Sequence, residues 1–386
     1  MAANPIPARL LSWLERELPA WRQVLDQLVA CESPSGDGEG LRECSAICAA
    51  HFAQRAGLDR PEVVGSDRAP VLRLRRRRAG RGAPVLLLGH LDTVWERGGY
   101  RAGNEPRGER VLGPGVFDMK GGVVVALAAL AALDEAELAT GPITVLLTGD
   151  EEVGSPTSRA LIEEEARQHA AALVLEPPQG PAVKVARKGV SQYRVVVQGR
   201  AAHAGLDPAS GINAVVALAE LVPRIAALSR SQLGTTVSPT VIKGGGRSNV
   251  IPAQAELVVD VRFSRAAEAE RVDRGLQALA VSGGAEVEVR GGVNRPPLER
   301  PASDGLFRLA ASVWAELGRG ELDGVAVGGG SDGSFTAALG VPTLDGLGIV
   351  GGHAHADGEW ADPGSIPERA ALLAGLLQRV GAGALR

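Results

Sequence analysis

Apolar residues recur at helical spacing near the start of the chain, over residues 10–30. Leucine, valine and tryptophan fall there at intervals of three and four residues, the pattern of an amphipathic helix. A turn-rich stretch, CESPSGDGEG, follows, and a second helix is predicted through Cys44 and Cys48. The pattern therefore predicts two helices before the first strand.

Short apolar runs typical of strands buried on both faces follow the two helices. They cover residues 71–74, 84–88, 142–147 and 172–175, and helices are predicted over residues 120–133 and 157–168. The alternation of strand and helix favours an α/β sheet. The most apolar segment, residues 121–133, is shorter than the roughly 20 residues that cross a bilayer, so we interpret it as a buried helix.

The pattern changes between residues 191 and 290, where the predicted order is β-α-β-β-α-β. The strands cover residues 191–197, 235–242, 255–262 and 285–290, and the helices cover residues 211–228 and 266–279. This order, over about a hundred residues, is that of a ferredoxin-like unit. We therefore predict a small domain, residues 188–295, inserted into a larger domain formed by residues 1–187 and 296–386.

Composition narrows the class of protein. The 386 residues are 45% hydrophobic and 22% charged, which excludes wholesale disorder. The net charge of −4 argues against a general nucleic-acid binder. The only cysteines are Cys31, Cys44 and Cys48, an odd number that fits a reducing compartment better than a disulfide framework. Residues 1–20 contain no unbroken apolar run, so we expect a cytoplasmic protein that does not bind membranes.

Two local features have a second interpretation. The arginine run at residues 75–78 could bind RNA, but it lies beside a turn between two predicted strands in a net-acidic chain. We interpret it as a solvated hairpin. Cys44 and Cys48 are one helical turn apart and could bind a metal, but two small buried thiols are the preferred interpretation.

Histidine and acidic residues gather at the ends of the predicted strands, where open α/β sheets bind their ligands. His90 and Asp92 follow the strand at residues 85–88, and extended spacing places both side chains on one face. Asp118 lies in a Gly-rich turn before the apolar helix. Taken alone, His90 and Asp92 are more often two polar residues that cap a strand. A single aspartate before a helix, such as Asp118, is usually a helix cap.

Further carboxylates follow other strands. Asp150, Glu151 and Glu152 come directly after an apolar strand, and three adjacent carboxylates repel one another unless a cation lies nearby. Glu176 follows the next strand, and His353 and His355 lie in a Gly-rich loop before the last helix. Together these nitrogen and oxygen donors suit a pair of zinc-like ions, and one carboxylate would be left to act as a general base.

At this point the chain resembles the M20 metallopeptidase family, in its glutamate carboxypeptidase (carboxypeptidase G2-like) branch. Nine segments carry the resemblance in the family's order: GHLDTV, GPGVFDMKGG, TGDEEVGS, LEPP, GRAAHAG, GINA, SNVIPAQAELVVDVR, GGGSDGSF and HADGEW. The resemblance implies a zinc-peptidase-like α/β catalytic domain, with a mixed sheet flanked by helices, and an inserted ferredoxin-like α+β domain that forms a homodimer.

The resemblance also implies two Zn²⁺ per subunit, and Co²⁺ or Mn²⁺ would accept similar ligands. Asp118 bridges the two ions, His90 and Glu176 complete one, and Glu152 and His355 complete the other. The family pattern of a histidine followed four residues later by glutamate and an aromatic residue is met by His355, whereas His353 stands where glycine is common.

Other roles follow from the same resemblance. Glu151 is the general base, Asp92 is the partner of His90, and His203 reaches into the partner subunit's site to steady the carbonyl oxygen. The terminal carboxylate of the substrate is held by three residues, Asn249, Arg262 and Arg295. Arginine suits this task because its planar fork binds carboxylates with two hydrogen bonds.

The implied activity is hydrolysis of the amide bond of a C-terminal or N-acylated amino acid, by a hydroxide that bridges the two ions, with Glu151 as general base. The substrate is then a small N-acyl amino acid or a peptide. One alternative is an N-acyl-amino-acid deacylase of the acetylornithine-deacetylase type. Another is a non-catalytic binding protein that retained the fold.

Overall fold

The computed structural model describes residues 6–76, 80, 82–102 and 109–385, and these form two compact units. The first comprises residues 1–186, 300–327 and 331–386, and the second comprises residues 187–299 and 328–330. Each unit has its own hydrophobic core.

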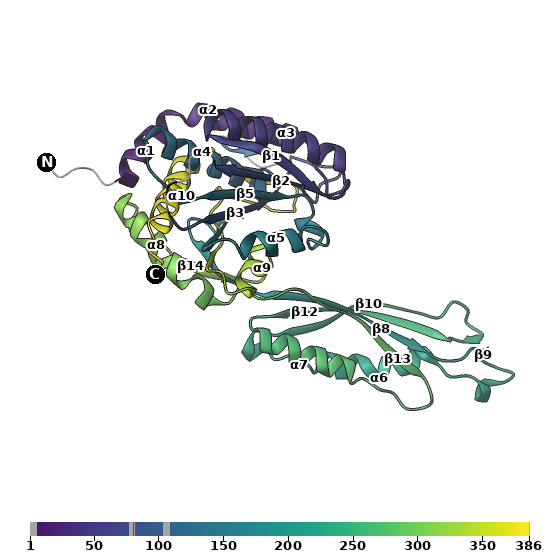
Figure 1. Cartoon of the computed structure of the whole chain (residues 1–386). Helices are drawn as coiled ribbons and strands as arrows, with labels where there is room; N and C mark the ends of the chain where they lie inside the picture. Colours follow the sequence, from purple (N-terminus) through teal and green to yellow (C-terminus); the bar gives the residue numbers. More distant parts are fainter. Residues whose placement is uncertain (1–5, 77–79, 81, 103–108, 386) are drawn as a thin grey trace. The chain divides into compact units, whose positions relative to one another are not determined.

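The first unit is built on a six-stranded mixed sheet in the order β1-β2-β5-β3-β6-β15 (Figure 1). Strands β5, β3, β6 and β15 are parallel, whereas β1 and β2 are antiparallel to their neighbours. The strands are β1 Leu58–Gly65, β2 Pro70–Arg76, β3 Val85–His90, β5 Ile143–Thr148, β6 Ala171–Val174 and β15 Thr343–Leu344. The predicted α/β class with a mixed sheet is confirmed.

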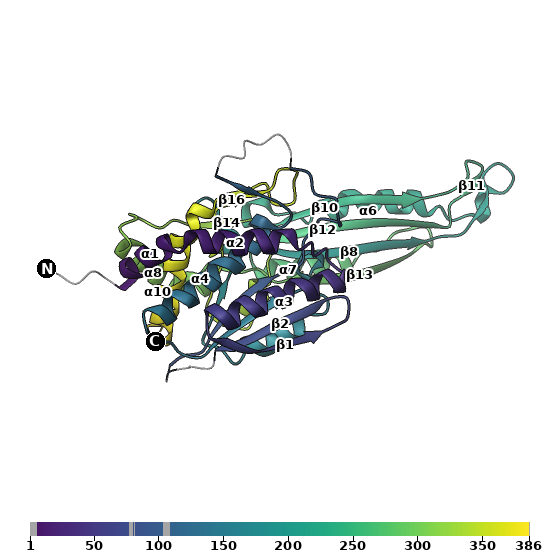
Figure 2. The same ribbon diagram turned by 90° about the horizontal axis from the view of Figure 1, so that it is seen from above.

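Helices cover both faces of this sheet (Figures 1 and 2). The helices of the first unit are α1 Ile6–Arg16, α2 Leu18–Ala30, α3 Gly38–Arg55, α4 Gly121–Glu135, α5 Arg159–Ala166, α8 Arg300–Glu316, α9 Gly333–Ala338 and α10 Ile366–Gly381. In β3, Val85 and Leu87 pack toward the large core that includes α4 and α10, while Leu86 and Leu88 pack toward α5 and α9. Successive side chains of a strand point to opposite faces, so burial of both faces explains why this run is apolar throughout.

Small strands complete the first unit. They are β4 Val111–Leu112, β7 Val183–Arg187, β14 Gly324–Val327, β16 Gly351–Gly352 and β17 Trp360–Ala361. The strands β16, β17 and β4 form one small sheet, and β14 pairs with β7. Among the described residues one helical stretch, Val116–Glu135, has the length and apolar composition of a membrane span, and 94% of its most apolar window is buried. That burial is expected of a core helix, in agreement with the sequence pattern.

Two local predictions for the first unit need correction. Residues 10–30 belong to two helices rather than one. The helix is interrupted at Glu17, and α2 begins with a proline in its first turn. The arginine run is not simply solvated: Arg76 is buried, and it pairs with Asp134 and donates to Thr140 Oγ1 at 2.8 Å. Arg77 and Arg78 lie outside the described residues.

The three cysteines are free and buried, as the preferred interpretation of Cys44 and Cys48 predicts. All three side chains belong to the large core of the first unit. They pack there as small apolar groups.

The second unit is a four-stranded antiparallel sheet in the order β10-β12-β8-β13, with α6 and α7 packed on one face. Its elements are β8 Gly189–Gln198, α6 Ala214–Ala226, β10 Thr236–Gly244, β12 Gln254–Phe263, α7 Ala266–Gln277 and β13 Glu286–Arg295. The six elements of the predicted ferredoxin-like order are therefore present. A short ribbon, β9 Ala202–His203 paired with β11 Val250–Ile251, is added to them.

Candidate metal centre

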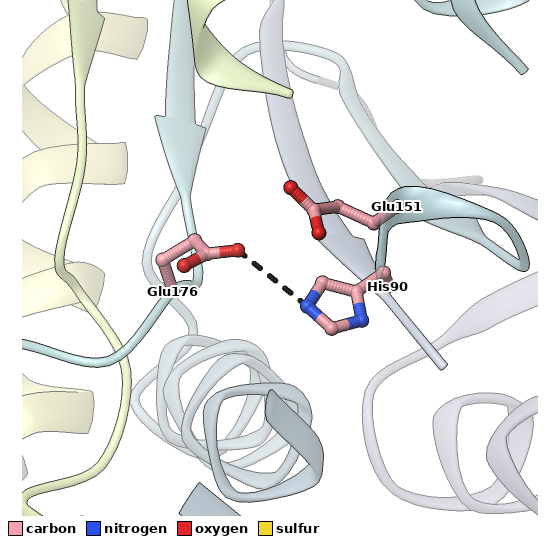
Figure 3. Close-up of side chains that lie close together, drawn as sticks. All are labelled: His90, Glu151 and Glu176. Atoms are coloured by element: carbon pink, nitrogen blue, oxygen red, sulfur yellow. Dashed lines mark ion pairs between the residues drawn. The ribbon is translucent and has the colours of Figure 1, made fainter. Parts of the chain in front are cut away.

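Acidic residues and a histidine meet where three parallel strands of the first unit end. His90 is the last residue of β3, Glu151 begins the helical turn after β5, and Glu176 follows β6. One ligand atom from each of these residues lies within 4.8 Å of the others. Figure 3 shows the carboxylate of Glu176 pointing toward the ring of His90, with 3.5 Å between His90 Nε2 and Glu176 Oε1. Parallel strands bring these residues together because their carboxyl ends share one edge of the sheet.

Asp118 lies between two histidines and presents one carboxylate oxygen to each. Its Oδ1 is 3.3 Å from His90 Nε2, and its Oδ2 is 3.2 Å from His355 Nε2. The residue belongs to the turn that leads into α4, as the sequence predicts. Its position divides the cluster into two halves that share a single carboxylate.

Glu152 completes the second half of the cluster. Both of its carboxylate oxygens lie 3.0 Å from His355 Nε2. The ring of His355, rather than that of His353, therefore contacts the acidic residues. Both histidines have a φ of 61°, in the left-handed region that non-glycine residues seldom adopt. The loop therefore adopts an unusual backbone conformation at the residue whose ring contacts Asp118 and Glu152.

The electrostatics of the cluster follow from burial and close opposite charges. Burial opposes protonation of His90, but the carboxylates of Asp118, Asp92 and Glu176 outweigh it and raise its pKa well above the usual value. The carboxylates of Asp118 and Glu152 raise the pKa of His355 to about 10. Burial raises the pKa of Glu152. A histidine binds a metal ion as the neutral imidazole, so a bound cation would displace protons from these two rings.

The donor atoms fit a pair of divalent cations. Ligands about 2.0–2.1 Å from a tetrahedral zinc ion lie about 3.3 Å from one another. The separations around His90 Nε2 are 3.3 and 3.5 Å, and those around His355 Nε2 are 3.0 and 3.2 Å. Two imidazoles with several carboxylates are also the donor set that zinc and similar ions accept.

Asp92 is fully buried and holds the surrounding backbone. Its Oδ1 accepts a hydrogen bond from the backbone N–H of Glu151, and its Oδ2 accepts one from that of Glu152, both at 3.1 Å. The hydroxyl of Ser35 donates to Oδ2 at 2.7 Å. The ring of His90 donates from Nδ1 to the backbone carbonyl of Asp92 at 3.0 Å, while the carboxylate is 3.4 Å away. Asp92 thus positions the Glu151–Glu152 turn as well as His90.

Sequence reasoning missed two groups that support the cluster. Ser35 is one, and its only signal is its place in a turn-rich stretch. Glu359 is the other: its carboxylate accepts hydrogen bonds from the backbone of the Asp118 turn. Its presence in the HADGEW segment was the available signal, although sequence reasoning used it only to choose between two histidines.

The four remaining predicted residues lie in the second unit, in two separate places. Arg262 on β12 and Arg295 on β13 both pair with Val190, near the start of β8. The short ribbon of β9 and β11 lies beyond the other end of β8 (Figure 2). It carries His203, next to Asn249, whose carbonyl accepts the Ala204 N–H at 2.9 Å. The eight residue steps from Val190 to Gln198 span about 26 Å of strand.

The side chains of these four residues also differ in what they contact. His203 is exposed, and its Nδ1 accepts the N–H groups of Gly205 and Leu206, both at 3.1 Å. The guanidinium of Arg262 pairs with Asp260 of the same strand at 2.9 and 3.0 Å. Arg295 is 8% exposed. The second unit therefore does not bring the four residues to one point.

Comparison with known proteins identifies relatives over most of the chain. Residues 86–379 match the model of peptidase family M20/M25/M40. The chain is 34% identical to carboxypeptidase G2 of Pseudomonas sp. (strain RS-16) over 388 residues, which cover 95% of this chain and 91% of the relative. It is 28% identical to a succinyl-diaminopimelate desuccinylase of Wolinella succinogenes, over 76% of this chain and 81% of the relative.

The fold has close counterparts among solved structures. A protein of Bacillus subtilis, described as a dinuclear metal binding peptidase from the M20 family, has a TM-score of 0.69 and 18% sequence identity. The superposition covers 96% of this chain and 99% of that chain.

Proposed function

The chain belongs to peptidase family M20/M25/M40 and is a hydrolase that acts on amide bonds, and on this premise we propose that it is a di-zinc enzyme. It releases an amino acid from a peptide C-terminus or from an N-acylated amino acid, as a glutamate carboxypeptidase does. The observation that carries this proposal is the position of Asp118, with one oxygen 3.3 Å from His90 and the other 3.2 Å from His355.

Five residues would hold the two ions. Asp118 would be shared. Its Oδ1 faces His90, whose Nε2 also lies 3.5 Å from Glu176, and its Oδ2 faces His355, whose Nε2 also lies 3.0 Å from Glu152. Bound divalent ions would polarise the amide carbonyl and lower the pKa of a water molecule. Zinc suits the mixed nitrogen and oxygen donors, and cobalt or manganese would accept the same set.

Glu151 is the proposed general base. It is 7% exposed, and its backbone N–H is held by Asp92 at 3.1 Å, so its carboxylate has a defined place beside the metal ligands. One of its carboxylate oxygens lies within 4.8 Å of ligand atoms of His90 and Glu176. From there Glu151 would take a proton from the attacking water and return it to the leaving nitrogen. A positioned carboxylate of this kind is worth about 10²- to 10⁴-fold in rate.

We also propose a homodimer formed through the second unit. The edge strand β10 carries Val241 and Ile242, which are 45% and 59% exposed, and α6 carries Val215 and Val216, which are 37% and 54% exposed. An apolar surface beside an open strand edge favours pairing with another copy. In the proposed dimer, His203 of one copy steadies the carbonyl oxygen in the site of the other.

The separation between the two ends of β8 supports this division of labour. Arg262 and Arg295 are two of the three proposed ligands of the substrate carboxylate, and they lie about 26 Å along the strand from the end near His203 and the third ligand, Asn249. A small amino-acid derivative cannot span that distance. Contact with both groups would therefore require residues from two copies.

The second candidate is an N-acyl-amino-acid deacylase of the acetylornithine-deacetylase type. The identity of 28% to a succinyl-diaminopimelate desuccinylase favours keeping it. The two candidates differ in the group on the acyl side, which pocket shape decides. Hydrolysis of N-acyl glutamates, compared with N-acetyl and N-succinyl derivatives of other amino acids, separates them by which amine is released.

The decisive experiment compares two adjacent substitutions, Glu151→Gln and Glu152→Gln. We expect Glu151→Gln to retain both ions and to lower kcat by about 10²- to 10⁴-fold, because only the proton acceptor is lost. Glu152→Gln should instead lower metal content, because a proposed ligand is lost. Metal content is measured by elemental analysis after dialysis, and turnover by amine release. Full activity of the Glu151→Gln variant would refute the assignment.

A further inference from the structure

Glu359 is a buried carboxylate that the proposed reaction does not use. It is 1% exposed, and it lies in the first unit between the loop of His355 and strand β17. Each of its oxygens accepts two hydrogen bonds. Oε1 accepts the backbone N–H groups of Phe117 at 2.9 Å and Asp118 at 3.0 Å. Oε2 accepts the indole N–H of Trp95 at 2.8 Å and the backbone N–H of Gly115 at 3.2 Å.

All four of these partners are donors. A protonated carboxyl group would direct its own hydrogen at an N–H group, so the arrangement suits an ionised carboxylate. Burial raises the pKa of Glu359, and the four donors act against that shift. Three of the four donors belong to the backbone between Gly115 and Asp118. The carboxylate of Glu359 therefore makes most of its hydrogen bonds to the turn that carries Asp118.

The same residue also fixes the loop of His355. Glu359 follows His355 by four residues, and its own N–H donates to the carbonyl of Ala356 at 3.1 Å. Its carbonyl accepts the hydroxyl of Tyr100 at 2.9 Å and the N–H of Gly113 at 3.3 Å. Main chain and side chain thus attach one end of the His355 loop to the segment that leads to Asp118.

We propose that Glu359 is the positioning residue of the dinuclear site, setting the place of the shared ligand Asp118 relative to His355. This inference rests on the proposed function, because it assumes that two ions share Asp118. Glu359 itself lies behind the Asp118 backbone and is not a ligand. Residues that orient ligands in this way typically change metal affinity by about 10- to 100-fold when they are replaced.

The substitution Glu359→Gln tests this role because the two side chains have the same shape. In the wild type each carboxylate oxygen of Glu359 accepts from two donors. Glutamine offers one oxygen and one NH₂ group in their place. In either orientation the NH₂ group meets N–H groups. If the NH₂ group takes the place of Oε2, one of those donors is the Trp95 indole, and Trp95→Phe removes it. We therefore expect Trp95→Phe, added to Glu359→Gln, to restore part of the lost Zn²⁺ affinity.

The matched control is Glu165→Gln. Glu165 is also 1% exposed in the first unit, and it pairs with Arg73 and Arg75, each at 2.9 Å, away from the metal ligands. Zn²⁺ affinity is measured by competition with a chromophoric chelator on stripped protein, and thermal unfolding of the stripped protein is recorded in parallel. A general loss of stability would lower the unfolding midpoint of both variants, whereas only a positioning role changes metal affinity in one.

We expect Glu359→Gln to weaken Zn²⁺ binding by about 10- to 100-fold, Glu165→Gln to leave it within about threefold, and Trp95→Phe added to Glu359→Gln to recover part of the loss. If Glu359→Gln does not fold, the double variant is compared with Trp95→Phe alone. Unchanged affinity in Glu359→Gln, beside two ions per chain in the wild type, would overturn the inference alone. A wild-type chain that binds no divalent ion would overturn the dinuclear proposal with it, and two bound ions without hydrolysis would count against the proposed reaction only.

Discussion

Replacement of Asp92 by asparagine is expected to loosen the turn that carries Glu151 and Glu152. The carboxylate of Asp92 accepts both backbone N–H groups of that turn at 3.1 Å, one on each oxygen. Asparagine keeps one oxygen only. If its NH₂ group replaces Oδ1, the N–H of Glu151 loses its acceptor. If the NH₂ group replaces Oδ2, the N–H of Glu152 loses its acceptor. The Ser35 hydroxyl, which now donates to Oδ2, can turn and accept a hydrogen bond from that NH₂ group.

The size of the effect follows from these contacts. One buried N–H group without an acceptor costs about 1–3 kcal/mol. The remaining bond loses its charged partner, which costs about 1 kcal/mol more. The turn should therefore open more easily by about 2–4 kcal/mol, which corresponds to roughly 30- to 700-fold faster hydrogen exchange of its amides. Because Glu151 is the proposed base, kcat should fall by about 10- to 100-fold.

The assay is hydrogen exchange with mass spectrometry over the peptide that contains Glu151 and Glu152, together with kcat on an N-acyl amino acid. The control is Asp37→Asn, the same chemical change at the N-cap of α3, where Asp37 accepts the Gly40 N–H at 3.2 Å. Asparagine caps helices as well as aspartate does. Asp37 also pairs with Arg97, whose side chain is 49% exposed, and surface pairs of this kind contribute little, so the control should cost less than about 1 kcal/mol. Exchange in the Asp92→Asn variant within threefold of the wild type, with kcat unchanged, would refute the reasoning.

Two further predictions concern pH and packing. Arg271 beside Glu268 lowers the pKa of this carboxyl to about 2, so the stabilisation is complete above an unfolded pKa of about 4.3 and is lost as the pH falls toward 2. The thermal midpoints of the wild type and Glu268→Gln should differ at pH 7 and converge near pH 2; an equal difference at both would contradict the assignment. A Cβ at Gly122 would lie 1.9 Å from the carbonyl oxygen of Leu175, so Gly122→Ala should destabilise the first unit by about 3 kcal/mol or more in urea unfolding. Gly246→Ala, whose Cβ meets nothing within 4 Å, should stay within about 0.5 kcal/mol, and equal effects would contradict the packing argument.

Local patterns in the chain were sufficient for the elements and their order. The apolar run in β3 indicated burial on both faces because alternate residues of a strand face opposite layers, and these layers are the two cores of the first unit. The β-α-β-β-α-β order of the middle segment was likewise legible from its periodicity. The break at Glu17 was missed, because the apolar spacing continues across it and only the proline of α2 marks the new helix.

The sequence by itself determined which chemistry-bearing residues end up at strand ends, because local patterning predicts where a strand stops and which residues come next. Tertiary structure decided which of them meet. Glu152 and His355 are 203 positions apart, and no local spacing places them 3.0 Å from each other. Resemblance to the family pattern in HADGEW already favoured His355 over His353. The two N–H groups that Asp92 accepts from the turn after β5, and the hydrogen bonds of Glu359 to the Asp118 turn, depend on contacts between distant segments. Such contacts are set by how the strands and helices pack, which residue spacing along the chain does not encode.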